Sequence, residues 1–329
     1  MSGVQQRAVA RDEVGMRLDR WFAVNFPGLP HSHLQKLIRS GQVRVDSARA
    51  KPDTRLERGQ IVRIPPITLA RAAPNAAPRA GEAEFLRSIL IHESQDILVF
   101  NKPAGLAVQG GSGTARHLDG MLAALTDKKG EAPKLVHRLD RDTSGCLLVA
   151  RNRATAAHFS KVFRTRSARK IYWAVTAGVP APPQGRISCF LVRQGTADGE
   201  QMRVVAQGVE GAQHSLSHYS VIDRAGDRFA WVSLKPVTGR THQLRVHMAE
   251  LKSPILGDPR YFNLKGFEAP AGLGEGLHLH ARRLALPLPG GARLDISAPL
   301  PAHMARTFDT LGFDAARYDA QSADPEEAT

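Results

Sequence analysis

The chain has 329 residues, of which 42% are hydrophobic and 23% are charged, as in an ordinary soluble globular protein. Its formal net charge of +14 indicates a polyanionic partner, nucleic acid before any other, although a merely basic soluble protein has the same property. The two cysteines, Cys146 and Cys189, form no CxxC pair, which argues against a disulfide framework and a cysteine zinc site. No early apolar run is long enough for a signal peptide or a membrane span, so we expect a cytoplasmic protein without a membrane partner.

The first part of the chain is expected to contain a flexible basic N-terminus over residues 1–14 and a compact module over residues 15–66. Apolar periodicity predicts two helices and then two strands within this module, over residues 17–24, 33–39, 43–45 and 59–64. Five basic residues lie on or next to the helices, where they can contact phosphates: Arg17, Arg20, Lys36, Arg39 and Arg44.

The module resembles a known RNA-binding domain. Residues 17–46 (RLDRWFAVNFPGLPHSHLQKLIRSGQVRVD) and 53–64 (DTRLERGQIVRI) are similar to an S4 RNA-binding domain. Such domains occur in many RNA-associated proteins, so the resemblance implies RNA binding but no particular reaction.

Residues 67–84, rich in Ala, Arg and Pro, are expected to form a flexible linker. A second globular domain is expected over residues 85–314, followed by a disordered acidic tail over 315–329. Its first strands are predicted at 88–91 and 97–100. The glycine-rich loop that follows lacks the GKS or GKT ending of a P-loop, so a nucleotide cofactor is not supported.

A polar loop over residues 137–145 precedes an apolar run, 146–150, that is typical of a buried strand. Charged side chains packed beside a core strand are costly unless they pair or take part in chemistry. Asp140 has Arg138 and Arg141 as neighbours, and nearby cations keep a carboxylate ionised. An ionised carboxylate without a metal can serve as a nucleophile or a base. A purely structural salt-bridged loop is the alternative.

The segment 151–170 contains seven Lys or Arg residues and no acid, and a helix is predicted within it over 154–163. This run fits a nucleic-acid surface, although a solvated face is the simpler alternative. The next predicted strand, 170–175, turns Lys170, Tyr172 and Ala174 to one side. Tyr172 is therefore either a stacking group or a core aromatic residue.

The remaining elements are predicted to be four strands and two helices. Strands are expected over 215–223, 229–234, 277–286 and 293–296, and helices over 241–248, capped by Thr241, and 301–311. The histidines lack the spacing of the common helical zinc motif, so no metal is expected.

Three stretches together resemble one enzyme family. Residues 137–145 (HRLDRDTSG) are similar to the HRLDxxTSG signature of the RluA family of pseudouridine synthases. Residues 169–172 (RKIY) and 236–247 (PVTGRTHQLRVH) resemble its second and third blocks, and 101–105 and 256–258 also fit. The resemblance implies an α+β fold, with a mixed, largely antiparallel β-sheet flanked by helices around a central cleft.

The resemblance also implies roles for individual residues. Asp140 corresponds to the catalytic aspartate, with its step left open: attack on C1′, attack on C6 or removal of a C2′ proton. Arg245 is expected to pair with Asp140. Tyr172 is expected to stack on the target uracil and Leu244 to pack on its other side.

Further residues are expected to contact RNA. Arg138 is placed to enter the space that the uridine vacates when it flips out of its stack. Arg240 and His242 are candidates for contacts to the phosphate backbone. Lys102 is expected to contact a phosphate or to pair with an acid, and Asp142 is expected to be structural.

An S4 domain ahead of a synthase domain points to enzymes that modify 23S ribosomal RNA, naked or in an assembling large ribosomal subunit. Two subtypes of the family share this plan and both remain open, as does another ribosomal or transfer RNA substrate. A non-catalytic RNA-binding or ribosome-assembly protein and a metal-dependent nuclease are the alternatives of other classes. We expect a monomer that uses no cofactor.

Overall fold

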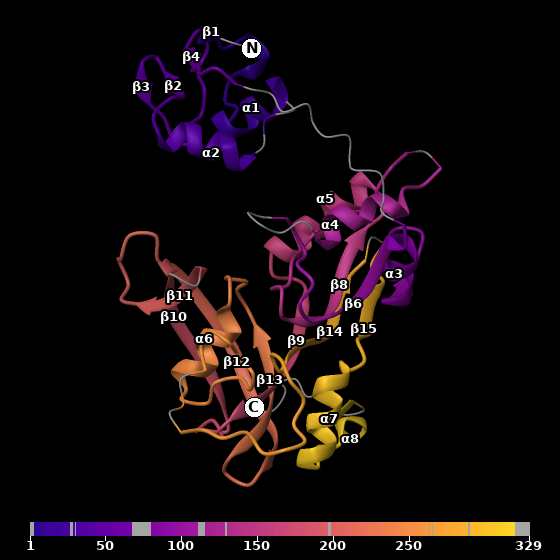
Figure 1. Cartoon of the computed structure of the whole chain (residues 1–329). Helices are drawn as coiled ribbons and strands as arrows, with labels where there is room; N and C mark the ends of the chain where they lie inside the picture. The colour runs from indigo at the N-terminus through magenta and orange to yellow at the C-terminus, as the bar shows by residue number, and fades with distance from the viewer. Residues whose placement is uncertain are drawn as a thin grey trace. The chain divides into compact units, whose positions relative to one another are not determined.

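The chain divides into two compact units, with the boundary between residues 77 and 78 (Figure 1). The computed structural model describes residues 3–26, 29, 31–67, 80–110, 116–128, 130–196, 199–262, 264, 266–288 and 290–319. No helix within these ranges is long and apolar enough to cross a membrane. Both cysteines are free thiols.

The first unit is a small sheet with two α-helices and one 3-10 helix. The helices are η1 (Arg11–Glu13), α1 (Leu18–Asn25) and α2 (His31–Arg39). The strands are β1 (Gln5–Ala8), β2 (Arg44–Val45), β3 (Ala48–Arg49) and β4 (Ile61–Ile64), in the order β1-β4-β2-β3. The two α-helices and the strands β2 and β4 lie where periodicity predicts them, whereas β3 was not predicted.

Aromatic packing stabilises this unit. Trp21 and Phe22 of α1 are fully buried, and their rings meet edge to face with centroids 5.2 Å apart. Leu34, Leu37 and Ile38 of α2 pack into the same core, because they recur at the three- to four-residue spacing of one helix face.

The expectation of a flexible N-terminus is wrong for residues 5–8 and 11–13, which form β1 and η1. Residues 5–8 form β1, which pairs antiparallel with β4 from Gln5 opposite Ile64 to Ala8 opposite Ile61. All four side chains of β1 are exposed, so the strand is held by backbone hydrogen bonds and leaves no apolar pattern in the sequence.

The second unit contains one mixed sheet of 11 strands. Nine of them follow the order β11-β10-β12-β13-β9-β14-β8-β6-β5, while β15 pairs with β14 and β7 with β8. The strands are β5 (Leu90–Glu93), β6 (Ile97–Lys102), β7 (Lys134–Leu135), β8 (Ser144–Ala150), β9 (Arg169–Ala177), β10 (Gln184–Thr196), β11 (Gly199–Val205), β12 (Gln213–Ala225), β13 (Phe229–Pro236), β14 (Leu279–Pro287) and β15 (Arg293–Ser297). Its pairings are antiparallel except for β8 with β14, which confirms the predicted mixed, largely antiparallel sheet.

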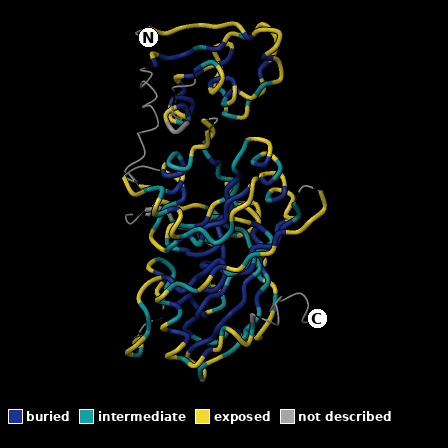
Figure 2. Tube along the Cα trace, turned by 90° about the vertical axis from the view of Figure 1, so that its right-hand side faces the viewer, coloured by how far each residue is buried: buried dark blue, intermediate teal, exposed yellow. Residues whose placement is uncertain are grey.

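Helices pack on both faces of this sheet, and Figure 2 shows buried residues concentrated in the interior of this unit. The helices are α3 (Glu82–Ser88), α4 (Leu118–Met121), the 3-10 helix η2 (Leu122–Leu125), α5 (Arg153–Arg164), α6 (Gln243–Glu250), α7 (Ala302–Leu311) and α8 (Ala315–Asp319). Alternate residues of β8 pack on opposite layers, because neighbouring side chains of a strand point to opposite faces. Leu147 contacts the core under α3 and α4, while Leu148 contacts the core under α5.

The other half of the sheet is layered in the same way. Val232 of β13 packs with Leu244 and Met248 of α6, whereas Trp231 packs with Phe308 of α7 on the opposite face. The α+β architecture implied by the sequence is thus present in this unit.

A short parallel pairing joins the two halves of the sheet. Ser144 and Gly145 of β8 lie opposite His280 and Ala281 of β14, and Ser144 Oγ lies 2.9 Å from His280 Nδ1. Gly145 has a φ of 110°, and a Cβ at this position would lie 2.3 Å from the carbonyl oxygen of Ala281. Glycine is therefore required where the polar loop enters the strand.

The expected boundaries of the second unit need correction at both ends. Residues 82–84, expected in the linker, begin helix α3, and 68–79 lie outside the described residues. Residues 315–319, expected in the disordered tail, form α8, where Tyr318 packs edge to face on Trp231 with centroids 5.1 Å apart. Residues 320–329 also lie outside the described residues.

Candidate active site

The loop that carries Asp140 is tied down at both of its ends. His137 accepts a hydrogen bond at its Nε2 from the backbone N–H of Leu148, at 2.9 Å, and its ring stacks on Phe163 at 4.2 Å. Burial, followed by the positive charge of Lys170, lowers the pKa of His137 to about 3, so the ring is a neutral acceptor. At the other end, the N–H of Thr143 donates to the carbonyl of Asp140 at 3.2 Å.

Lys102 holds the middle of the Asp140 loop in place. Its ammonium donates to the carbonyl oxygens of Pro103, Leu106 and Arg141, each at 2.9 Å, and the side chain is fully buried. Three acceptors match the three N–H groups of an ammonium. Burial lowers the pKa of Lys102 to about 7, although the charges of Asp142 and Asp140 oppose this shift. The predicted contact of Lys102 with RNA or with an acid is therefore wrong, because backbone carbonyls occupy its amine.

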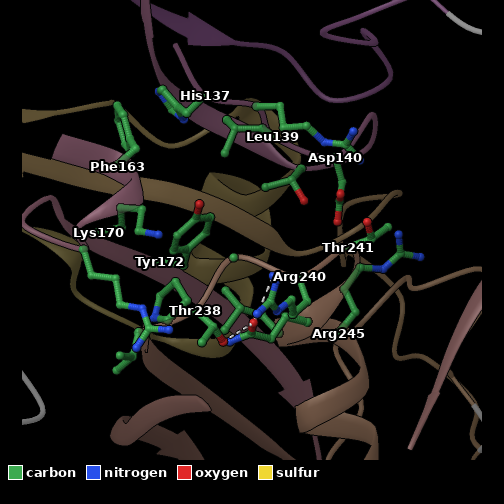
Figure 3. A pocket seen from close by; sticks show the side chains of 18 of the residues that line it. His137, Leu139, Asp140, Phe163, Lys170, Tyr172, Thr238, Arg240, Thr241 and Arg245 are labelled. Carbon is green, nitrogen blue, oxygen red and sulfur yellow. Dashed lines mark hydrogen bonds between the residues drawn. The ribbon is translucent and has the colours of Figure 1, made fainter. Parts of the chain in front are cut away.

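The Asp140 carboxylate is half-buried and lies on the boundary between two cavities. The first has a volume of about 620 Å³ and also contains Tyr172, Leu244 and Arg245. The second, of about 430 Å³, includes Arg138 and His242. Within the described residues, no side chain forms a hydrogen bond or an ion pair with this carboxylate. Figure 3 shows Asp140 projecting into the first cavity, with Thr241 and Arg245 near it.

Arg245 does not pair with Asp140, contrary to the prediction. Its Nε donates to Asp258 Oδ2 at 2.8 Å and its Nη2 to Asp258 Oδ1 at 2.6 Å. Both side chains are almost fully buried. Burial opposes the charge of Arg245, but hydrogen bonding to Asp258 and the charges of Asp258 and Asp140 raise its pKa above the ordinary value. Arg245 thus remains a fixed cation whose field reaches Asp140.

Tyr172 lies between two core clusters, one on each half of the sheet, and lines the first cavity. Its ring is half-buried, so one part of it packs and another part is available to a ligand. Burial raises the pKa of its hydroxyl, and the negative charge of Asp140 adds to this effect. The phenol is therefore neutral at physiological pH.

The N-terminus of α6 brings Thr241, His242 and Leu244 to the cavities. The predicted cap at Thr241 is wrong: His242 occupies the N-cap position, in the left-handed region with φ 53°, and forms no capping hydrogen bond through its side chain. Its Nδ1 instead lies 2.8 Å from the hydroxyl of Tyr261. Burial lowers the pKa of His242, with Asp140 opposing this and Arg245 reinforcing it.

Arg240 lies on the rim of the first cavity. Its backbone N–H donates to Gln243 Oε1 at 3.0 Å and its Nε to the carbonyl of His214 at 3.1 Å. The same Oε1 also accepts from the hydroxyl of Thr238 at 2.6 Å, while Gln243 Nε2 donates to the carbonyl of Leu216 and to the hydroxyl of Ser217.

Three residues of the site were not singled out from the sequence: Asp258, Tyr261 and Gln243. Gln243 and Asp258 belong to blocks that resemble the family. Their spacing in the sequence does not predict that Asp258 pairs with Arg245 or that Gln243 bonds to the loop at Arg240. Tyr261 joins two distant segments, because its hydroxyl accepts from the N–H of Met202 at 2.9 Å while it contacts His242.

The five basic residues expected to contact phosphates in the first unit are exposed. Two of them already have partners. Arg17 forms a bidentate pair with Asp19, with Nη2 to Oδ2 at 2.7 Å, and Arg44 donates to the carbonyls of Gly41 and Ser47. Lys36 and Arg39 extend from the last turn of α2.

Among the residues that the structure describes, no three His, Cys, Asp or Glu side chains are grouped to hold a metal ion. The candidate site is thus built from one carboxylate, one phenol, several cations and apolar walls.

Comparison with known proteins identifies the class of enzyme. A family model described as RNA pseudouridylate synthase matches residues 96–250. The solved structure of human RNA pseudouridylate synthase domain containing 4 superimposes with a TM-score of 0.59 at 32% identity, covering 70% of this chain and 95% of that chain. The chain belongs to the RluA family of RNA pseudouridine synthases, which are isomerases.

Two bacterial relatives are similar over nearly their whole length. The ribosomal large subunit pseudouridine synthase C of Escherichia coli (strain K12) is 36% identical over 315 residues, which are 92% of this chain and 95% of that protein. The protein of the same name from Vibrio vulnificus (strain CMCP6) is 34% identical, with 94% and 96% covered.

Proposed function

We propose that this enzyme isomerises uridines of 23S ribosomal RNA in the large subunit, with Asp140 as the catalytic aspartate. The relatives named as ribosomal large subunit pseudouridine synthase C support the substrate, because the similarity extends over both units. A cytoplasmic location follows from that substrate. The observation that carries the assignment of Asp140 is its carboxylate, which lines the cavity and has no ionic partner among the described residues, whereas Arg245 is occupied by Asp258.

The arrangement suits a base that has left its RNA stack. A flipped uracil enters the cavity with one face on Tyr172 and the other toward Leu244, since these two side chains supply its apolar walls. Asp140 is then presented to the glycosidic region of the nucleotide, and the cation Arg245 lines the same cavity.

Three basic or polar residues surround this position. Arg138 is exposed on the Asp140 loop and lines both cavities, which suits insertion where the uridine leaves the stack. Arg240 lines the first cavity and His242 lines the second, both next to the start of α6. Both residues are proposed to contact the phosphate backbone.

The first unit is proposed to be an S4 domain that increases affinity for RNA. Its two helices and sheet follow the pattern of the resembling stretches, and exposed cations lie on α2. Non-specific attraction to phosphates requires only such exposed charges.

Pseudouridine mapping on unmodified 23S transcript tests the proposal. Carbodiimide labelling and primer extension should reveal new stops after treatment with the wild-type enzyme and none with Asp140→Asn. The matched control is Asp142→Asn, which changes the neighbouring carboxylate of the same loop and should keep the stops. Full activity of Asp140→Asn would refute the role of Asp140, and stops only in another cellular RNA would refute the substrate.

A further inference from the structure

Lys170 lines the first cavity and has no part in the function proposed above. It stands on β9 two residues before Tyr172, so both side chains lie on the same face of the strand. Figure 3 shows Lys170 and Asp140 on opposite sides of Tyr172, with Phe163 and His137 above Lys170. A base stacked on Tyr172 therefore has a carboxylate on one side and an ammonium on the other.

Apart from Asp140, the charged side chains that line this cavity in the described part of the chain are all cations. Arg164, at the end of α5, and Arg166, in the following turn, line the same cavity. His137 is neutral, so it offers no compensating charge. Within the described residues, no hydrogen bond or ion pair engages Lys170, and burial, followed by the charge of Arg166, lowers its pKa. Burying an ammonium without a counter-ion is costly, which points to an anion supplied by the substrate.

The backbone conformation of Arg166 also indicates a ligand-binding site. It has a φ of 62°, in the left-handed region that residues other than glycine rarely adopt. Strained residues of this kind concentrate at ligand-binding sites, where the surrounding structure enforces them. The turn thus directs a third cation to this end of the cavity.

We propose that Lys170, together with Arg164 and Arg166, binds one phosphate group of the RNA strand beside the flipped uridine. This inference rests on the proposed function, because it requires a nucleotide on Tyr172. Three cations fit a charged phosphate better than a neutral uracil carbonyl, since only an anion balances them. The phosphate would fix the strand on the side of the base opposite Asp140, so that the sugar is held between them.

The test uses the full-length enzyme and a stem-loop RNA that contains the uridine found by mapping. Each phosphate flanking that uridine is replaced in turn by an uncharged methylphosphonate, on a 2′-O-methyl sugar. The reference strand carries the same sugar with an ordinary phosphate. Binding is measured with wild type, Lys170→Met and the control Lys161→Met, whose lysine is exposed on α5 and does not line the cavity.

We expect one methylphosphonate to weaken binding to wild type roughly 10-fold to 100-fold, the range for a charge-assisted hydrogen bond. Lys170→Met should lose a similar factor on the reference strand and nothing further from that methylphosphonate. Its slope of log affinity against log salt should fall by about 0.7, one single-strand phosphate contact. Lys161→Met should behave as wild type.

Equal losses from every methylphosphonate in wild type and Lys170→Met would overturn the phosphate site, as would unchanged affinity in Lys170→Met. If Lys170→Met fails to fold, Arg166→Gln tests the same site from an exposed position, with a smaller loss confined to the same linkage. Failure of the proposed function is seen separately, as a wild-type enzyme that forms no pseudouridine in 23S RNA.

Discussion

Arg245 and Asp258 form a bidentate ion pair inside the protein, while Asp140, in the same cavity, has no ionic partner among the described residues. Removing the charge of Asp258 therefore leaves a buried guanidinium uncompensated. For Asp258→Asn we expect a loss of about 3 to 5 kcal/mol in the free energy of unfolding, together with lower activity. Denaturant unfolding and single-turnover rates measure the two effects.

The chain offers a matched control for this ion pair. Arg283 and Asp295 form a pair of the same bidentate geometry, 2.7 Å for both bonds, but on the surface. Asp295→Asn should cost about 1 kcal/mol or less, because solvent screens this pair. Equal costs for the two variants would contradict the view that burial makes the Arg245 pair essential.

Lys102→Met tests how the Asp140 loop is held. Between pH 7 and the ordinary lysine pKa of 10.5, the unfolded chain keeps a proton on Lys102 that the folded chain releases. The contribution of Lys102 to stability therefore increases as the pH rises through this window. The stability difference, wild type minus Lys102→Met, should increase from pH 7 to 9.5 by up to about 1.4 kcal/mol per pH unit.

Lys134→Met is the control for this pH dependence, because the Lys134 amine donates one hydrogen bond, to the carbonyl of Ala132. The pH profile of Lys102→Met is compared with that of this variant. A flat difference between wild type and Lys102→Met would show that the Lys102 amine keeps its proton in the folded enzyme across this range. Lys102→Met should also lower the rate of isomerisation, since the carbonyl of Arg141 loses its tether to the amine.

Tyr172→Phe and Tyr172→Ala separate stacking from hydroxyl chemistry. Phenylalanine keeps the ring against the base, whereas alanine removes it, and base stacking on an aromatic ring contributes about 1 to 3 kcal/mol. We expect kcat/KM to fall roughly 10-fold to 100-fold in Tyr172→Ala and clearly less in Tyr172→Phe. If the two variants lose the same activity, the neutral hydroxyl and not the stack is the functional part.

Charge removal on α2 tests the first unit in the full-length enzyme. Lys36→Gln combined with Arg39→Gln should weaken RNA binding and reduce the salt slope by about 1.4 to 1.8, two phosphate contacts. Arg17→Gln is the comparison, because Asp19 already neutralises Arg17, and its effect should be smaller. Unchanged affinity in the double variant would argue against an RNA-binding role for α2.

Local patterns in the sequence predict much of this fold. Apolar spacing finds α2 and α5, since Leu34 and Phe159 belong to helix faces that pack on a core. Alternation finds β9, and the apolar run over 146–150 finds most of β8. These features depend on residues close together in the chain, which is why sequence alone suffices for them.

What the sequence does not show depends on distant contacts or on the backbone. The strands β10 and β11 form a long hairpin in a region without a recognisable motif. Strand β1 carries no apolar side chain toward the core, so only its pairing with β4 reveals it. The partner of Arg245 is a choice between two carboxylates, Asp140 and Asp258, and the family pattern leads to the wrong one.

The parallel pairing between β8 and β14 affects how the enzyme responds to amino-acid substitutions. Asp140 precedes β8 in one half of the sheet, while Tyr172 and Arg245 belong to the other half. The parallel join between the halves contains two residue pairs, a Ser144–His280 hydrogen bond and a contact of Cys146 Sγ with the carbonyl of Arg282. The spacing of the reacting groups thus depends on a parallel pairing that is far shorter than the two strands it connects. Substitutions in this pairing should displace the reacting groups relative to one another before they unfold the protein.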